Sequence, residues 1–306
     1  MNKAIAPSTA AESQKTDWLP LGLLLLLSLI WGSSFILMKR GLAVYSYEQV
    51  GALRICFSFL AMTPFVWKGI KQIKAHKWKY VTLMGFLGNF IPAFLFAIAV
   101  SKLESSLVGI LNALTPLFTL LVGIAAFKGA IKRVQLIGLL LGFVGCAFLS
   151  FINGNGGFGP LNFYVLFVVS ATICYATSSN IIKAHLSDIP PIPLTACAMI
   201  IIGPLAAVYL FSTDFTQRLT QVPNAWEALG YLAILGVIGT ALGLVLFNIV
   251  IKKTSAVYAT SVTYIIPIVA ISWGVFDGEK LFAMHFLGMG LIIGGIYLVN
   301  LARKKG

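Results

Sequence analysis

Charged residues are scarce in this sequence. Asp, Glu, Lys and Arg account for 10% of its 306 residues, and only nine residues are acidic. Soluble domains average about 25% charged residues. With 59% hydrophobic residues and a mean hydropathy of +0.94, the chain is too apolar to fold around one water-exposed core. The composition therefore excludes a soluble globular protein and predicts an integral membrane protein.

Residues for catalysis, metal binding and nucleotide binding are also few. The four cysteines lie inside apolar segments without CxxC or metal-ligand spacing, and the three histidines are scattered. No GxxxxGK[ST] loop occurs, and no polar stretch is long enough for a soluble nucleotide-binding domain. We therefore predict no catalytic residue, no metal, no cofactor and no nucleotide partner.

Positive charge is present but not concentrated. The formal net charge of +13 is spread over short loops such as KGIKQIKAHKWK and FKGAIKR. Loops of this kind are orientation signals in membrane proteins, which retain basic residues on the cytoplasmic side. We therefore predict cytoplasmic N- and C-termini and no nucleic-acid partner. Lys39 and Arg40, which fall on the predicted outer side, are the local exception.

Long apolar runs dominate the rest of the chain. A membrane-spanning helix needs about 20 apolar residues. Such runs follow a polar stretch, residues 1–18, which we interpret as a disordered cytoplasmic tail and not as a signal peptide. The predicted fold is an all-α integral membrane protein with ten transmembrane helices. They cover residues 19–38, 48–67, 80–101, 105–127, 134–152, 161–182, 193–211, 228–251, 255–276 and 283–302.

An internal repeat relates the two halves of the chain. A shift of 151 positions, the distance from Pro116 to Pro267, places GFLGN on GVIGT and aligns residues across four predicted helices. The aligned pairs include Phe96 with Phe247, Gly123 with Gly274 and, after a one-residue slip, Gly138 with Gly288 and Gly145 with Gly295. We predict two five-helix repeats, residues 19–152 and 161–302. Because five is odd, the second repeat enters the membrane inverted.

Inverted repeats with interrupted helices are typical of secondary transporters. Pro116 and Pro267 break the fourth and ninth predicted helices at corresponding positions, and Pro92 lies in the third. A proline frees the carbonyl four residues earlier, here that of Asn112 and of Thr263, and this carbonyl then needs another partner. We therefore assign Pro92, Pro116 and Pro267 to helix interruption and gating.

Short motifs occur in a fixed order along the chain. They are LIWGSSF in the first predicted helix, ALRICFSF in the second, the TP and IP prolines, and GEKLFAMHFLGMGLIIGGIYLV near the end. Over about residues 18–302 the chain resembles the EamA family of the drug/metabolite transporter superfamily. The resemblance implies ten helices, cytoplasmic termini, export, and a cavity bounded mainly by helices three, four, eight and nine. Members often carry a Glu after the proline helix in both halves; this chain has Glu279 but Lys128.

Helical spacing identifies a candidate substrate-binding surface. Asn89 and Phe96 share one face of the third predicted helix, and Asn112 and Thr115 share one face of the fourth. With their second-half counterparts they predict a mostly apolar pocket with a few neutral hydrogen-bonding groups. The predicted substrate-binding residues are Trp31, Asn89, Phe96, Asn112, Thr115, Tyr175, Thr240, Phe247, Thr263, Tyr264 and Trp273. For each polar residue taken alone, bonding between neighbouring helices is the alternative.

Arg54 is the one charged residue well inside a predicted span. Charges inside a membrane are costly and are usually functional. Two interpretations stay open for this side chain. It either makes structural contacts with the outer interface or helix-end carbonyls, or it recognises a substrate carboxylate.

Together these features predict a secondary transporter of the bacterial inner membrane. It exports a small amphipathic metabolite, such as an amino acid or a drug-like solute, by alternating access, and its partners are that solute and the lipid bilayer. The alternative is an intramembrane enzyme acting on a lipid or lipid-linked substrate, which needs a catalytic cluster that the sequence does not display. All nine acidic residues fall in tails, loops or span ends. We therefore predict transport without a proton-carrying carboxylate at the membrane centre.

Overall fold

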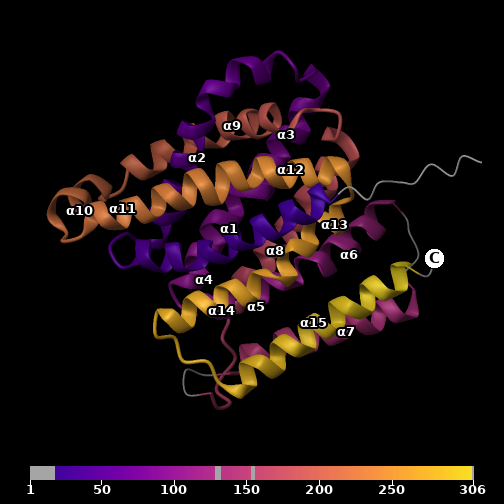
Figure 1. The fold of residues 1–306 in the computed structure, drawn as a ribbon. Helices are drawn as coiled ribbons and strands as arrows, with labels where there is room; N and C mark the ends of the chain where they lie inside the picture. Colours follow the sequence, from indigo (N-terminus) through magenta and orange to yellow (C-terminus); the bar gives the residue numbers. More distant parts are fainter. Residues whose placement is uncertain (1–17, 128–131, 153–155, 305–306) are drawn as a thin grey trace, which may run out of the picture.

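The computed structural model describes residues 18–127, 132–152 and 156–304, and over these residues the chain is helical (Figure 1). No strand occurs within these ranges; one isolated β-bridge joins Ile152 to Phe158. The helical elements of the first half are α1 (Leu19–Leu42), α2 (Tyr47–Ile70), η1 (Ala75–Lys77), α3 (Trp78–Gly85), η2 (Phe86–Phe90), α4 (Ile91–Val100), α5 (Ser105–Leu111), η3 (Asn112–Leu114), α6 (Thr115–Phe127) and α7 (Arg133–Ser150). Those of the second half are α8 (Val165–Ile181), η4 (Ile182–Leu186), α9 (Pro191–Phe211), α10 (Phe215–Gln221), α11 (Ala225–Ile234), η5 (Leu235–Leu242), α12 (Gly243–Lys253), α13 (Ala256–Thr260), η6 (Ser261–Tyr264), α14 (Ile266–Phe276) and α15 (Ala283–Lys304).

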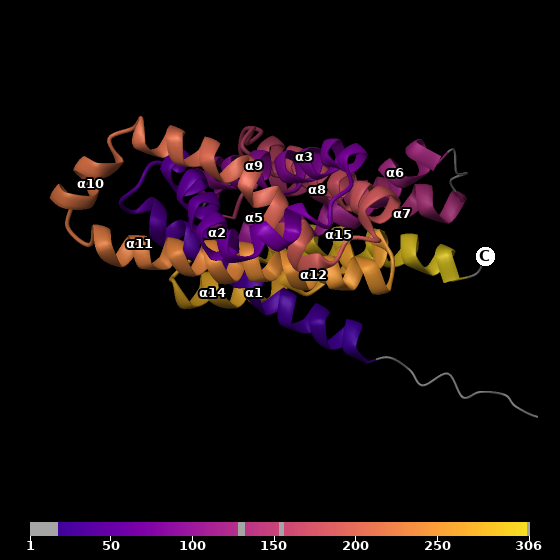
Figure 2. The ribbon, with the colours of Figure 1, turned by 90° about the horizontal axis from the view of Figure 1, so that it is seen from above.

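Single long helices and runs of consecutive helical elements form segments that are long and apolar enough to cross a membrane. Within the described ranges, nine helical segments meet this condition by length and composition, and α15 contributes a shorter apolar stretch, Ala283–Val299. Large apolar side chains also cover the outside of the molecule. Figure 2 shows the first turns of α1 projecting from the bundle, where Leu21, Leu25 and Leu29 are exposed. An apolar exterior fits a multi-pass membrane protein. The number of ten spans stays a prediction.

Two long helix pairs lie on opposite sides of the bundle. The helices α2 and α9 pack together on one side, and α7 and α15 pack together on the other (Figure 1). Close backbone approach explains the second pair, because a Cβ atom on Gly138 would collide with the carbonyl of Gly295. A Cβ atom on Gly145 would lie 2.9 Å from the carbonyl of Gly288. Small residues are what allow membrane helices to pack this closely.

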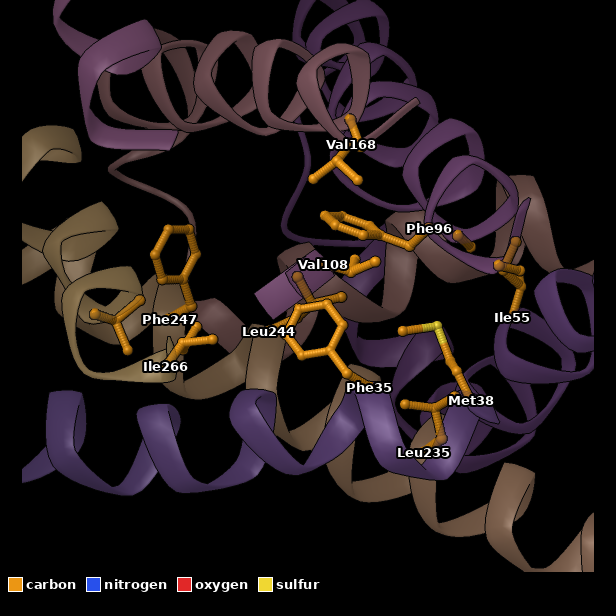
Figure 3. Packing of buried hydrophobic residues seen from close by; sticks show 14 of the residues in the cluster. Phe35, Met38, Ile55, Phe96, Val108, Val168, Leu235, Leu244, Phe247 and Ile266 are labelled. Atoms are coloured by element: carbon orange, nitrogen blue, oxygen red, sulfur yellow. The ribbon is translucent and has the colours of Figure 1, made fainter. Parts of the chain in front are cut away.

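The core lies between these pairs. Figure 3 shows side chains from α1, α4 and α12 converging there, among them Phe35, Phe96 and Leu244. The ring centroids of Phe35 and Phe96 are 5.8 Å apart in an edge-on arrangement that aromatic pairs favour. The first and third spans of one half therefore meet the eighth span of the other in the centre.

Helix irregularities cluster around this core in both halves. The 3-10 turns η3 and η6 interrupt the helices that carry Pro116 and Pro267, and each proline sits in the first turn of the helix that follows. Proline fits that position because the first backbone N–H groups of a helix have no intrahelical acceptor. The π segments η2 and η5 widen the third and eighth spans. π turns often mark functional sites.

The breaks in the fourth and ninth spans follow the sequence-based expectation, since α5 and α6 are joined by η3, and α13 and α14 are separated by η6. One detail differs from that expectation. The segment Phe215–Gln221, expected as a loop, forms the short helix α10. Its apolar residue Phe215 is buried against Tyr45, which gives this otherwise polar segment a surface on which to fold.

Candidate substrate-binding cavity

A cavity lies in the core where the irregular segments of both halves meet. It is surrounded by α1, α2, α8 and by the broken third, fourth, eighth and ninth spans. The residues that line it are Trp31, Ser34, Phe35, Met38, Arg54, Met84, Gly88, Asn89, Phe96, Asn112, Thr115, Tyr175, Ser178, Ser179, Ile182, Gly239, Thr240, Leu244, Phe247, Thr260, Val262 and Thr263. The lining is mostly apolar, as expected for a small-molecule site.

Most of the predicted binding residues meet in this cavity. Those that line it are Trp31, Arg54, Asn89, Phe96, Asn112, Thr115, Tyr175, Thr240, Phe247 and Thr263. Tyr264, Trp273 and the three prolines are not among the lining residues. Pro92, Pro116 and Pro267 are buried, and each lies in the first turn of a helix that follows a segment with lining residues: η2, η3 or η6.

Tyr264 and Trp273 lie outside the cavity lining, although they belong to the same span as Thr263. Trp273 is 45% exposed on α14, and its Nε1 donates a hydrogen bond of 2.8 Å to Ser33 Oγ on α1. Tyr264 is half-buried and packs against the apolar core. Around a regular α-helix with 3.6 residues per turn, a residue ten positions after Thr263 lies about 80° away from it. Trp273 therefore does not share the face of Thr263.

Aromatic rings form the apolar walls of the cavity. The ring centroids of Trp31 and Phe247 are 5.1 Å apart, and those of Phe96 and Tyr175 are 5.6 Å apart. The indole Nε1 of Trp31 donates a hydrogen bond of 2.8 Å to the carbonyl of Gly239. This bond fixes the ring and satisfies a carbonyl of the π segment η5, so the wall and the helix irregularity depend on each other.

Arg54 forms a polar corner of the same cavity. Its Nε donates a 2.7 Å hydrogen bond to Thr240 Oγ1. The Thr240 hydroxyl in turn donates to the carbonyl of Leu235, five residues earlier, at 3.1 Å. One helical turn away, Ser58 Oγ on α2 donates to the carbonyl of Gly236 at 2.7 Å. The widened turn of η5 thus exposes carbonyls that side chains satisfy, and it positions Thr240 under Arg54.

Two further polar groups bear on the cavity. Asn89, on the π segment η2, is buried, and its amide nitrogen Nδ2 has no hydrogen-bond partner among the described residues. The carbonyl of Asn112, freed by Pro116, accepts a 2.8 Å hydrogen bond from the Thr115 hydroxyl. The freed carbonyl is therefore satisfied within the protein, whereas the Asn89 amide is left with donor capacity.

On the first and sixth spans, sequence reasoning predicted Trp31 and Tyr175 but missed further lining residues. Ser34 and Met38 on α1 follow Trp31 at helical spacing, and Ser178 on α8 and Ile182 at the start of η4 follow Tyr175 in the same way. These residues follow the predicted aromatic residue at i+3 and i+7, so the helical period could have identified them from the sequence. Small serines are weak signals by themselves, because they also serve close helix packing.

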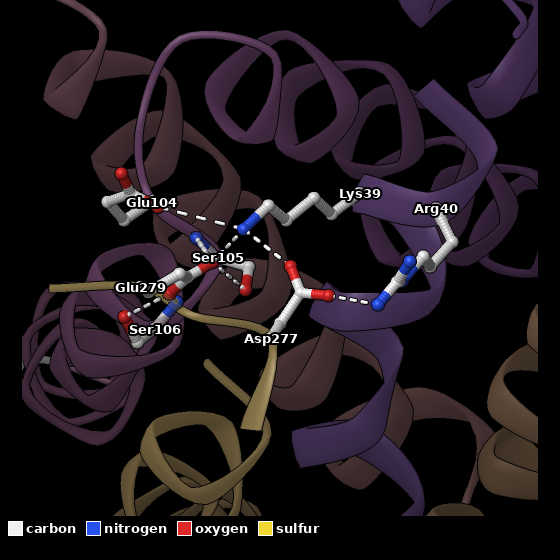
Figure 4. Close-up of polar contacts among 7 residues, drawn as sticks. All are labelled: Lys39, Arg40, Glu104, Ser105, Ser106, Asp277 and Glu279. Atoms are coloured by element: carbon white, nitrogen blue, oxygen red, sulfur yellow. Dashed lines mark hydrogen bonds and ion pairs between the residues drawn. The ribbon is translucent and has the colours of Figure 1, made fainter. Parts of the chain in front are cut away.

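A cluster of charges lies at the end of the bundle where α1 finishes (Figure 4). Lys39 Nζ lies 2.7 Å from Asp277 Oδ2, 2.8 Å from Glu279 Oε1 and 3.8 Å from Glu104 Oε2. Arg40 pairs with the other oxygen of Asp277. The two basic residues that formed the exception to the charge rule are therefore neutralised by carboxylates from distant segments.

Glu279 also anchors the start of α5. Its carboxylate accepts hydrogen bonds from the backbone N–H groups of Ser105 and Ser106, both at 3.0 Å, and from their hydroxyls at 2.6 and 2.5 Å. Burial alone would raise the pKa of this carboxyl. The hydrogen bonds from Lys39, Ser105 and Ser106 outweigh burial and lower its pKa to about 2. Glu279 is therefore an ionised structural cap at neutral pH.

His285 lies close in sequence but outside this cluster. Its Nδ1 accepts a 3.1 Å hydrogen bond from the backbone N–H of Phe282, one turn before it, at the start of α15. The imidazole thus caps the N-terminal end of α15. Within the described part of the chain, no group of three or more His, Cys, Asp or Glu side chains has the geometry of a metal site.

The fold and the cavity define a class: an all-helical, multi-pass membrane protein with a mostly apolar central site. The chain belongs to the EamA-like transporter family, which it matches over residues 18–151 and 162–301.

Related proteins carry transporter names. "Uncharacterized inner membrane transporter YedA" of Escherichia coli K12 is 24% identical over 292 residues, which cover 93% of this chain and 92% of that protein. "Probable amino-acid metabolite efflux pump" of Salmonella typhimurium is 25% identical, with 90% and 93% covered. A solved structure described only as "Crystal structure of protein" has a TM-score of 0.65 at 16% identity and covers 94% of this chain and 98% of its own. That likeness shows a shared fold.

Proposed function

We propose that this protein is a secondary transporter that exports a small amphipathic metabolite by alternating access. The observation that carries the proposal is the buried central cavity, lined by paired helix breaks from both halves of the chain. Transport sites of secondary transporters lie where discontinuous helices of two repeats meet. An amino acid or related solute is the first substrate class to test, because one relative is named as a probable amino-acid metabolite efflux pump.

The halves are proposed to be inverted repeats, residues 19–152 and 161–302, comprising ten spans. Reciprocal contacts support this arrangement. Gly138 meets Gly295 and Gly145 meets Gly288, whereas the repeat aligns Gly138 with Gly288 and Gly145 with Gly295. A two-fold relation between two segments produces this exchange of partners. The broken helices behave alike, since α5 contacts α14 and α6 contacts α13.

The orientation follows from charge. We infer an inner-membrane location with both termini in the cytoplasm, because the basic loops lie on one side under that arrangement. A relative named as an inner membrane transporter supports the location.

The rival function, an intramembrane enzyme acting on lipid, lacks a candidate catalytic cluster at the cavity. The described lining residues include no Asp, Glu, His or Cys. Acid–base or nucleophilic catalysis by side chains uses such groups. The lining instead offers hydroxyls, amides, aromatic rings and one guanidinium, which suit binding.

Transport by purified protein in liposomes tests the proposal. The assay follows efflux of a panel of radiolabelled amino acids and aromatic or branched organic solutes. Asn112→Ala, in the lining, is expected to reduce the flux of accepted solutes. Thr177→Ala is the matched control, since Thr177 is half-buried, is not part of the lining, and its hydroxyl donates to the carbonyl of Ile173 in its own helix. Absence of flux for every solute, together with chemical turnover of added lipid, would favour the enzyme.

A further inference from the structure

Arg54 is a buried cation inside the cavity for which the described chain provides no anion. Arg54 is 8% exposed, and among the described residues of the lining it is the one that carries a formal charge. The carboxylates of the described residues engage other groups near helix ends. Asp188 pairs with Lys77, Asp214 with Arg218, and Glu227 accepts from Tyr231. Glu104, Asp277 and Glu279 belong to the cluster around Lys39, and Glu48 interacts with Ser46 and Tyr47 at the start of α2.

A guanidinium in this position retains most of its bonding capacity. It has five N–H donors in a planar fork that matches a carboxylate. The bond from Nε to Thr240 uses one of them, and the Tyr175 hydroxyl also interacts with the guanidinium. Both neighbours are neutral. Burying a cation among neutral groups is costly unless an anion joins it.

Asn89 adds a second donor to the same cavity. The residue is 5% exposed, and its amide nitrogen is buried without a partner among the described residues. Such an orphaned donor costs about as much as a lost hydrogen bond, so its presence needs an explanation. An oxygen-rich ligand that binds Arg54 and Asn89 together explains both groups at once.

Apolar surface flanks this donor pair. Trp31 is tied to Gly239, the residue before Thr240, and its ring contacts Phe247. On the other side Tyr175 stacks on Phe96. A ligand held at Arg54 by its charged end therefore meets aromatic rings with the rest of its surface.

We propose that the cavity selects small organic carboxylates, with Arg54 and Asn89 binding the carboxylate and the aromatic walls binding the apolar part. This inference rests on the proposed transport function and narrows its substrate class. Because the described lining offers no carboxylate to an ammonium group, an anion is preferred over a neutral solute and a cation is rejected. Zwitterionic amino acids bind through their carboxylate and rank below the corresponding anion.

Four probes with the same phenyl group test this ranking. They are 3-phenylpropanoate (anion), phenylalanine (zwitterion), 3-phenylpropanamide (neutral) and phenethylamine (cation). Binding to the purified full-length protein is measured by calorimetry in detergent at pH 7. The wild-type protein is expected to bind the acid about ten- to hundredfold more tightly than the amide, the size of a hydrogen bond to a charged group. This comparison needs no variant.

Substitutions then separate recognition from structure. Arg54→Gln is expected to bring the acid-to-amide affinity ratio to about one or below, whereas a purely structural arginine would weaken both probes and leave the ratio unchanged. Asn89→Leu leaves the charge of Arg54 in place, so it is expected to reduce the acid-to-amide affinity ratio less than Arg54→Gln does. Arg218→Gln is the matched control and is expected to leave the ratio unchanged, because Arg218 carries the same charge on α10, outside the lining, where it is paired with Asp214.

The failures of the two proposals are distinguishable. Equal wild-type affinity for acid and amide, preference for the cation, or binding of none of the four probes would overturn carboxylate selection while leaving transport of other solutes intact. Absence of flux for every solute of the broader liposome panel would overturn the transport function itself.

Discussion

Two tryptophans make the same kind of hydrogen bond in opposite environments. The Nε1 of Trp31 donates to the carbonyl of Gly239 inside the cavity. The Nε1 of Trp273, on the exposed side of α14, donates to Ser33 Oγ on α1. Both bonds are 2.8 Å long. Removing the indole N–H at each position in turn therefore shows whether the effect depends on the location of the bond in the cavity.

We predict different outcomes for Trp31→Phe and Trp273→Phe. The first leaves the Gly239 carbonyl without its donor next to the cavity and is expected to cost about 1 kcal/mol of stability, together with severalfold slower transport. The second loses a bond at a position that is 45% exposed, so both properties should stay near wild type. Thermal unfolding in detergent and flux into liposomes measure the two effects. A larger loss of transport in the Trp273 variant would contradict the assignment of the cavity wall.

Glu279 acts at the scale of elements, because it ties together the end of α1, the start of α5 and the segment before α15. Its pKa of about 2 lies below the ordinary value of 4.5. A carboxyl whose pKa is depressed on folding stabilises the protein fully above its unfolded-state pKa. That contribution is then lost progressively as the pH falls from about 4.5 to about 2.

We therefore expect a pH-dependent effect of Glu279→Gln. At pH 7 the variant should unfold at a lower temperature than wild type, by about 1–3 kcal/mol in stability, because the charged hydrogen bonds from Lys39 and the serine hydroxyls are weakened. The difference should shrink below pH 4.5 and vanish near pH 2. Glu227→Gln serves as the control, since Glu227 is exposed and bonds only Tyr231 on its own helix. A difference between variant and wild type that is independent of pH would contradict the role of the ionised carboxylate.

The contact between α7 and α15 gives a second test at this scale. A methyl group added at Gly295 would collide with the carbonyl of Gly138 and lie 2.7 Å from the backbone nitrogen of Gly142. On the same helix, a methyl group at Gly290 would meet no atom within 4 Å. Gly295→Ala is therefore expected to destabilise the protein by about 1–3 kcal/mol, and Gly290→Ala to be neutral or slightly stabilising. Thermal unfolding of both variants checks the pair, and equal effects would contradict the close packing.

Helix positions were predictable from the sequence because the length of an apolar run sets the length of a membrane helix. Each of the ten predicted segments overlaps helical structure. Lining residues of the third, fourth and eighth spans were predictable as well, because residues within one or two turns stay on the same helix face. On the ninth span Thr263 lines the cavity, whereas Tyr264 and Trp273 were chosen as neighbours along the chain and do not share its face. The pairing of Lys39 with Glu279 was not predictable, because only the folded arrangement brings them together.

At the scale of the whole molecule, the question is which gradient drives transport. The proposed site binds one anionic group with one fixed cation, and its described lining has no carboxylate or imidazole that could carry a proton with the solute. Two groups elsewhere in the chain could in principle carry a proton, Glu279 and His285. Both instead cap helices at one end of the bundle. If the solute crosses as an anion without a proton, each cycle moves net charge.

We therefore predict that transport of 3-phenylpropanoate responds to membrane potential and not to a pH gradient alone. Moving one charge through 100 mV corresponds to about 2.3 kcal/mol, enough for accumulation of up to about fiftyfold. Liposomes with a potassium diffusion potential set by valinomycin should accumulate the anion when their interior is positive. Those with a pH gradient at zero potential should accumulate no more of it than protein-free liposomes, into which the protonated acid diffuses unassisted. The neutral 3-phenylpropanamide is the control, since potential exerts no force on it. Uphill accumulation driven by the pH gradient and abolished by Glu279→Gln or His285→Ala would show instead that a cap group carries the coupled proton.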